Sequence, residues 1–268
     1  MTDTATTDTS VTLGRLESEF RAKRADGRKL LVPYITGGYP GWQDAIRAAA
    51  ANGADAIEIG IPFSDPVMDG PVIQQASQAA LDAGAVPAAI LDEVPALDVD
   101  IPLAVMTYYN LVHHPGVERF AADLRRAGIC AAILPDLPLE ESGPWCAAAD
   151  AAGIETIMLA APTAPDARLP LVAARCRGFI YSVGLLGVTG ERSSLAETAT
   201  ALASRLKAIT DKPVLVGVGV SDAAQAYQVT RIADGVIQGA SVVRRLMEGG
   251  PDAVGEYVAE VRAAIDAP

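Results

Sequence analysis

Short apolar runs alternate with amphipathic segments along almost the whole chain. Each run has the length of a strand and is followed by a segment of helical periodicity, at a spacing of roughly 20 to 30 residues. Alternating strands and helices indicate a parallel sheet, and eight such units close it into a (β/α)8, or TIM, barrel. The eight predicted strands are residues 30–36, 56–62, 102–108, 129–134, 155–160, 179–183, 213–218 and 235–237.

An open doubly wound sheet is the alternative fold, but no G-x-G-x-x-G follows the first strand. An extra amphipathic helix at residues 13–25 precedes the first strand and is expected to cover one end of the core. The other predicted helices are residues 42–52, 71–83, 88–97, 117–127, 141–152, 167–176, 195–209, 222–229, 241–247 and 253–265. His113 and His114, followed by Pro115, suggest a surface loop.

One domain is expected to extend over residues 11–268, after a disordered tail at residues 1–10. The tail is rich in Thr and Asp and has neither the basic segment nor the apolar segment of a signal peptide, and no apolar run reaches membrane-spanning length. The net charge of −12, with no Lys/Arg-rich run, argues against nucleic acid or an anionic membrane as partner. The three cysteines lack CxxC spacing, which suggests reduced thiols in a cytoplasmic protein, and no His/Cys spacing indicates a metal site.

Glu58 is the most unusual residue in the predicted strands. Ile57, Ile59 and Ile61 alternate with Ala56, Glu58 and Gly60, so a strand here places the isoleucines on one face and Glu58 on the other. If that second face lines the barrel interior, burial raises the pKa of the carboxyl and a proton-transfer role becomes plausible. The alternative is a structural ion pair, but Arg47, on a predicted helix, is the only basic residue between Lys29 and Arg119. A proton-transfer role for Glu58 is therefore favoured over a structural ion pair.

Other polar residues follow the predicted strands and would share the same end of a barrel. They are Asp65, Asp69, Asp136 and Tyr181. An Asx turn or a helix cap would explain the aspartates equally well on local sequence. Core packing is the commoner role for an interior tyrosine such as Tyr181. Their contribution to a site stays open at this point.

Glycine-rich loops follow the last three predicted strands, at residues 184–190, 217–221 and 239–241. Glycine lets the main chain approach a ligand, and a helix N-terminus presents free N–H groups. Such turns also serve chain geometry alone, but three in consecutive loops favour a phosphate site that needs no Lys or Arg.

Several motifs in order resemble the tryptophan synthase alpha subunit family over residues 30–243. They are PYIT (33–36), EIGIPFSDP (58–66) continuing to DGPVIQ (69–74), YYN (108–110), PDLPLEE (135–141), GVTG (187–190), GVGVS (217–221) and DGVIQG (234–239). The resemblance implies a TIM barrel that cleaves indole-3-glycerol phosphate to indole and glyceraldehyde 3-phosphate by a retro-aldol reaction, without a cofactor in this chain. It also implies a beta subunit partner that carries pyridoxal phosphate, in an alpha2beta2 assembly, with residues 64–71 and 135–141 at the interface.

The resemblance also assigns roles to individual residues. It implies Glu58 as general acid/base, Asp69 as the carboxylate that accepts the indole N–H, and Tyr181 as a tyrosine near the acid/base. Thr189 matches a lid threonine that closes toward Asp69. The remaining matches are expected to line the indole pocket, at Tyr34, Ile73 and Met106, or to bind phosphate, at Gly190, Gly219 and Gly239.

Three departures from the family pattern fall in the expected site. Val218 replaces a common phenylalanine against the indole, and Ala240 replaces a phosphate-binding serine, whose contact Ser241 or backbone N–H groups would supply. Residues 184–186 (GLL) form a less polar lid start. Two alternatives remain: a weakly catalytic subunit that mainly activates a beta partner, and another phosphate-sugar barrel enzyme such as an isomerase.

Overall fold

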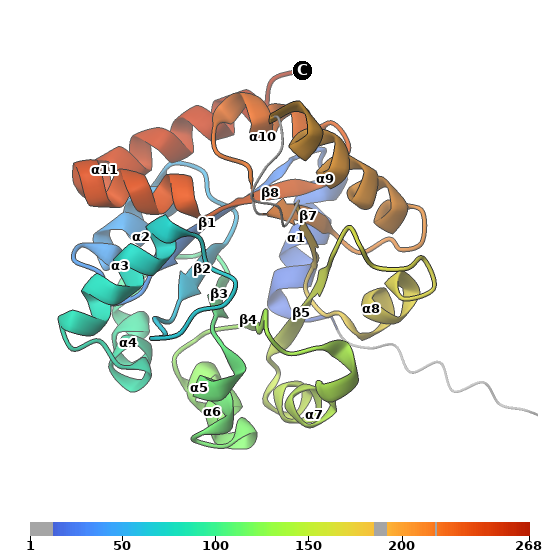
Figure 1. The fold of residues 1–268 in the computed structure, drawn as a ribbon. Coiled ribbons are helices and arrows are strands. Elements are labelled where there is room, and N and C mark those ends of the chain that lie inside the picture. The colour runs from blue at the N-terminus through green and yellow to red at the C-terminus, as the bar shows by residue number, and fades with distance from the viewer. Residues whose placement is uncertain (1–12, 185–191, 218) are drawn as a thin grey trace, which may run out of the picture.

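Eight parallel strands form a closed barrel in chain order, which confirms the predicted fold class. The computed structural model describes residues 13–184, 192–217 and 219–268, and Figure 1 shows its strands enclosed by helices. The predicted tail, residues 1–10, lies outside the described residues. The strands are β1 (Leu30–Thr36), β2 (Ile57–Gly60), β3 (Leu103–Met106), β4 (Ala131–Ile133), β5 (Glu155–Ala160), β6 (Ile180–Val183), β7 (Val214–Gly217) and β8 (Gly235–Gln238).

The helices follow the predicted order. Two short 3-10 turns are also present, η1 (Val94–Leu97) and η2 (Leu139–Glu141). No helix among the described residues combines the length and apolarity needed to span a bilayer. The α-helices are α1 (Arg15–Ala25), α2 (Trp42–Ala51), α3 (Pro71–Asp82), α4 (Pro87–Glu93), α5 (Tyr109–His113), α6 (Val117–Arg126), α7 (Gly143–Ala152), α8 (Leu169–Arg175), α9 (Arg192–Lys207), α10 (Ala223–Thr230) and α11 (Ala240–Ile265).

One prediction about the helices was wrong. Residues 109–113 form α5, so His113 lies in a short helix and not in a loop, although both histidines are exposed as predicted. A five-residue helix is too short to display a helical period in sequence. The two predicted final helices are confirmed: α11 consists of two helical stretches separated at Gly250, where φ is 72° and ψ is −167°, so the backbone is not helical there.

The apolar residues divide into two layers because strand side chains alternate between the two faces of the barrel. Ile57 and Ile59 belong to the large outer cluster between strands and helices. Ala56, Ala104 and Ala131 belong to the smaller inner cluster. The predicted orientation of strand β2 is thereby confirmed, and Glu58 faces the barrel interior.

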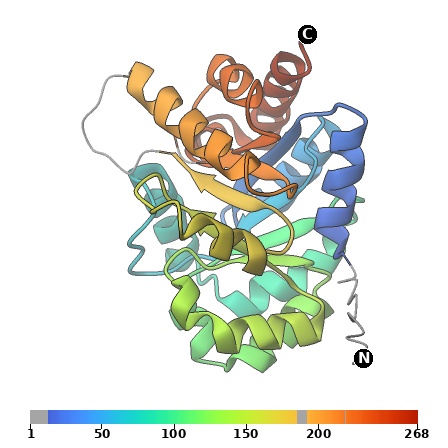
Figure 2. The same ribbon diagram turned by 90° about the vertical axis from the view of Figure 1, so that its right-hand side faces the viewer.

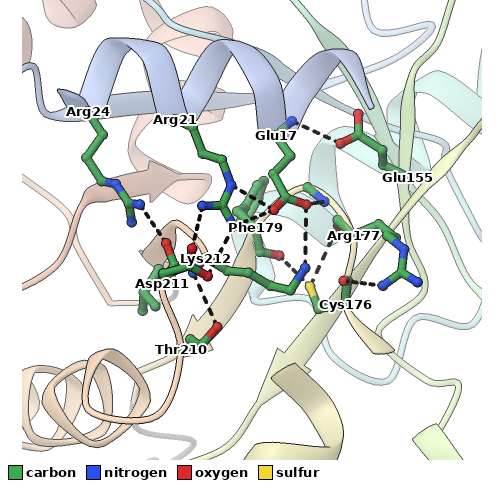
Figure 3. Close-up of polar contacts among 12 residues, drawn as sticks. Glu17, Arg21, Arg24, Glu155, Cys176, Arg177, Phe179, Thr210, Asp211 and Lys212 are labelled. Carbon is green, nitrogen blue, oxygen red and sulfur yellow. Dashed lines mark hydrogen bonds and ion pairs between the residues drawn. The ribbon is translucent and has the colours of Figure 1, made fainter. Parts of the chain in front are cut away.

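Helix α1 closes the end of the barrel opposite to the carboxyl ends of the strands (Figure 2). Its buried residues Leu16 and Phe20 join the inner cluster, as the sequence predicted for this helix. Polar contacts fix it there (Figure 3). The Glu155 carboxylate accepts hydrogen bonds from the N–H groups of Leu16 (2.7 Å) and Glu17 (2.9 Å). The Glu17 carboxylate in turn pairs with Arg21 (2.8 Å) and Lys212 (3.6 Å).

Candidate active site

A mainly apolar cavity of about 220 Å³ opens at the carboxyl ends of the strands. Every site residue that the family resemblance assigned and the structure describes lines it; Thr189, Gly190 and Val218 lie outside the described residues. The predicted residues that line it are Tyr34, Glu58, Asp69, Ile73, Met106, Tyr181, Gly219, Gly239, Ala240 and Ser241. Further lining residues are Met68, Gly70, Ile133, Pro135, Leu159, Val183, Val220, Ser221 and Ile237.

Glu58 presents a carboxyl group without a structural partner to this cavity. The residue is only 1% exposed, and its Oε2 has no hydrogen-bond partner in the described part of the chain. Burial, and secondly the negative charge of Asp69, raise the pKa of Glu58 to about 8. The rise expected for an interior carboxyl is therefore present. A proton held at neutral pH in an apolar cavity makes Glu58 a group that can donate it.

Asp69 extends from the loop between β2 and α3 and is partly buried. Burial raises the pKa of its carboxyl, and a hydrogen bond from the Tyr108 hydroxyl opposes that rise. The same hydroxyl accepts a hydrogen bond from the N–H of Met68 at 2.9 Å. Tyr108 thus orients the loop that carries Asp69. Sequence reasoning missed this role, although Tyr108 lies in one of the recognised motifs.

Two buried tyrosines, Tyr34 on β1 and Tyr181 on β6, flank the carboxyl groups. Burial is the largest cause that raises the pKa of both hydroxyls, and the charges of Glu58 and Asp69 add to it. Glycines make room for the rings. A Cβ at Gly60 would lie 1.8 Å from the Tyr34 Oη, and one at Gly217 would lie 2.3 Å from the Tyr181 Oη. Sequence reasoning assigned Gly217 to ligand approach, but its missing side chain accommodates Tyr181.

The glycine-bearing loops after β7 and β8 line the opposite part of the cavity through Gly219 and Gly239. Gly239 is the N-cap of α11, and no side chain caps that helix. The first turn of α11 therefore offers free N–H groups and a positive dipole end to an anion. In contrast, the Asp222 side chain caps α10 by accepting from Gln225 N. Of the two helix N-termini that the sequence predicted for phosphate binding, that of α11 has no side-chain cap and thus remains available to an anion.

Two predicted carboxylates do not reach the cavity. Asp65 is exposed, and its Oδ2 accepts a hydrogen bond from the Ser64 hydroxyl. Asp136 is also exposed and accepts a hydrogen bond from Tyr109 N at 2.9 Å, at the start of α5. Local hydrogen bonds satisfy both groups, and neither lines the cavity that contains Glu58.

Fold and cavity together are typical of a barrel enzyme that transfers protons to and from a ligand with an anionic end. The chain belongs to the tryptophan synthase alpha chain family, because the model of that family, described as "Tryptophan synthase alpha chain", matches residues 20–265. This family consists of carbon–carbon lyases, and its alpha subunit cleaves indole-3-glycerol phosphate and works with a beta subunit.

Individual proteins of this family are similar along nearly their whole length. The tryptophan synthase alpha chain of Streptomyces coelicolor is 44% identical over 245 residues, covering 90% of both chains. That of Thermobifida fusca is 43% identical over 265 residues, covering 94% of this chain and 98% of the relative. A solved tryptophan synthase chain from Mycobacterium tuberculosis superposes with a TM-score of 0.87 at 38% identity, covering 96% of this chain and all of that one.

Proposed function

We propose that this chain cleaves indole-3-glycerol phosphate in the cavity at the barrel mouth, with Glu58 as general acid/base and Asp69 as the partner of the indole nitrogen. The observation that carries these roles is the buried Glu58 carboxyl, which has a raised pKa and an unpartnered Oε2 beside Asp69. A structural glutamate would be expected to have a basic partner, and no ion pair among the described residues includes Glu58.

Glu58 has two proton transfers to perform. The protonated carboxyl adds a proton to indole C3, and the resulting carboxylate takes the proton of the hydroxyl on the adjacent glycerol carbon. The bond between these two carbons then breaks. Its electron pair forms the C2–C3 double bond of indole, and the glycerol carbon becomes the aldehyde of glyceraldehyde 3-phosphate. Protons and electrons balance, so neither a redox group nor a metal is required.

Asp69 stabilises the intermediate of this reaction. Protonation at C3 places positive charge on the indole nitrogen, and a carboxylate that accepts the N–H lowers the energy of that state. Burial raises the pKa of Asp69, and the hydrogen bond from Tyr108 opposes that rise and so favours the ionised form that this role needs. Tyr181 would stand beside the acid/base, and Tyr34, Ile73 and Met106 would enclose the ring.

The phosphate is assigned to the loops after β7 and β8, with Gly219, Gly239 and the free N–H groups at the start of α11 as ligands. Ala240 has no hydroxyl, so the side-chain contact would come from Ser241. The lid role of Thr189, the phosphate role of Gly190 and the wall formed by Val218 remain predictions.

The proposal extends to the assembly. Residues 11–268 would form one catalytic domain that pairs with a beta subunit in an alpha2beta2 complex, through residues 64–71 and 135–141. The exposed Val67 side chain on the first loop supports this placement. Pyridoxal phosphate would belong to the beta subunit alone. The free, buried Cys130, Cys146 and Cys176 are compatible with the reducing cytoplasm.

Steady-state release of indole from indole-3-glycerol phosphate, with and without a beta subunit, tests the proposal. We expect Glu58→Gln and Asp69→Asn to lower kcat by at least about a hundredfold, the range for lost acid/base catalysis. Asp65→Asn is the matched control in the assay without a beta subunit, because Asp65 lies on the same loop as Asp69 but outside the cavity, and its kcat there should match the wild type. Near-native turnover by a folded Glu58→Gln chain would remove Glu58 from its role. Activation of a beta subunit without cleavage would instead favour the weakly catalytic alternative.

A further inference from the structure

The C-terminal half of α11 returns to the loop after β7 because the chain changes direction at Gly250. This glycine has φ 72° and ψ −167°, and Pro251 follows it. On a straight helix, Tyr257 would lie about 25 Å beyond Ala240. Instead, α11 packs against both α2 and α10 (Figure 1). The Tyr257 hydroxyl reaches Ser221 in the loop after β7.

The Tyr257 hydroxyl lies between the two loops assigned to phosphate. It donates a hydrogen bond to the backbone oxygen of Ser221 at 3.2 Å. Burial raises the pKa of this hydroxyl, and the neighbouring Ser241 and Gln238 side chains oppose that rise. Ser241 Oγ and Gln238 Nε2 are buried atoms that lack a hydrogen bond of standard geometry within the described ranges. The hydroxyl thus lies in a polar cluster inside the otherwise apolar outer layer.

The loop between β7 and α10 has two attachments. The Ser221 N–H and hydroxyl both donate to Gln225 Oε1, at 2.8 and 3.0 Å, which attaches the loop to α10. The Ser221 carbonyl attaches it to α11 through Tyr257. Arg245, with its guanidinium 5.2 Å from the ring centre, covers the Tyr257 ring. Tyr257 therefore holds the Gly219 loop at a fixed place relative to the start of α11.

We propose that Tyr257 is a positioning residue for the phosphate group of the substrate. The Tyr257 hydroxyl lies between Ser221, in the loop after β7, and Ser241, at the start of α11. It thereby sets the distance between the two loops, both of which must contact the phosphate. This inference rests on the proposed phosphate site. It assigns Tyr257 no contact with the substrate.

Binding of glycerol 3-phosphate and of indole to Tyr257→Phe, measured separately by calorimetry, tests the inference. The variant retains the ring under Arg245 and loses one hydrogen bond, so we expect roughly five-fold weaker binding of glycerol 3-phosphate. The KM for indole-3-glycerol phosphate should rise similarly, while kcat and indole affinity stay within about twofold of wild type. Gln238→Leu leaves Tyr257 in place and should weaken phosphate binding in the same direction. It provides a second test if Tyr257→Phe does not fold.

Tyr227→Phe is the matched control. Tyr227 also lies under a guanidinium, that of Arg231 at 5.4 Å, but it donates its hydroxyl to Pro268 O at 3.3 Å, outside the two loops assigned to phosphate. Unchanged glycerol 3-phosphate affinity in a folded Tyr257→Phe chain overturns the inference. An equal loss for indole, or an equal loss in Tyr227→Phe, also overturns it. A wild type that binds glycerol 3-phosphate without cleaving the substrate would contradict the proposed reaction and leave the positioning role intact.

Discussion

At the residue scale, Glu58 links the chemistry of the site to the stability of the chain. Its folded pKa of about 8 lies above the ordinary 4.5, so between these values the folded state binds more protons than the unfolded state. Stability must therefore fall as pH rises through this window, by at most about 1.4 kcal/mol per pH unit from this group. Below the window, this contribution is fully retained.

Glu58→Gln should remove this pH dependence because glutamine remains neutral. We expect the free energy of unfolding of the variant, relative to wild type, to increase between about pH 5 and pH 8. Urea unfolding at several pH values measures it, with Asp65→Asn as the control that should follow the wild-type curve. Parallel curves for Glu58→Gln and wild type would show that Glu58 ionises normally in the folded chain.

Gly60 tests the fit between the tyrosines and the strands. A methyl group at this position would lie 1.8 Å from the Tyr34 Oη, and the buried ring has little room to move. We expect Gly60→Ala to lower the free energy of unfolding by about 1–3 kcal/mol, the usual range for an overpacked core, and to lower kcat because Tyr34 shifts beside Glu58. Gly143→Ala meets nothing within 4 Å and should be close to neutral. Equal urea midpoints for the two variants would contradict the tight packing.

A site residue can be predicted from sequence when nearby residues alone determine its surroundings. It cannot be predicted when contacts distant in sequence determine them. Glu58 is recognisable because strand alternation alone places it among apolar residues. Asp65 and Asp136 have equally suggestive neighbours, but the direction of a loop side chain depends on contacts that are distant in sequence, such as Asp136 with Tyr109. The pairing of Gly60 with Tyr34 is also a contact between strands, and no single stretch of sequence contains it.

At the element scale, the alternation of apolar runs and helices was sufficient to predict all eight strands and their order. Strand β1 has the predicted bounds, whereas β4 is limited to residues 131–133, because the apolar run extends beyond the hydrogen-bonded ladder. The position of α11 beside α10 depends on the backbone angles at Gly250, which the sequence marks only as a break. Local patterns therefore predict elements well and their long-range placement poorly.

Helix α1 has its N-terminal cap outside its own sequence. Gly14 supplies no capping side chain, and Glu155 of β5 accepts hydrogen bonds from the first-turn N–H groups of Leu16 and Glu17 instead. Glu155→Ala leaves these buried donors unpaired, so we expect a loss of about 2–3 kcal/mol in the free energy of unfolding.

Urea unfolding, together with amide hydrogen exchange in α1, measures this loss. The matched control is Glu19→Ala, which removes only the exposed pair with Arg15 (2.8 Å) and should cost less than about 1 kcal/mol. If α1 exchanges as slowly in Glu155→Ala as in wild type, the cap contributes nothing to docking.

At the scale of the whole molecule, one buried carboxylate joins the beginning and the end of the chain. Asp55, fully buried before β2, contacts Lys23 of α1 at 3.0 Å, Arg28 at 2.7 Å and Arg262 near the end of α11 at 3.0 Å. It also accepts a hydrogen bond from the N–H of Leu31 in β1. These contacts lie at the end of the barrel closed by α1, so stability and catalysis are located at opposite ends.

Asp55→Asn removes the charge that three cations share and nearly preserves the side-chain volume. Removing one partner of a buried pair costs about 3–5 kcal/mol. The lower end of that range is expected here, because Lys23 and Arg28 are 28% and 35% exposed and water can solvate them. Asp211→Ala, which breaks the pair between Arg21 and the 82% exposed Asp211 side chain, should cost less than about 1 kcal/mol. Urea unfolding distinguishes the two, and kcat of the folded Asp55→Asn chain should remain that of wild type because the cavity is at the far end. A large loss of kcat without a loss of stability would mean that the two ends of the barrel are coupled.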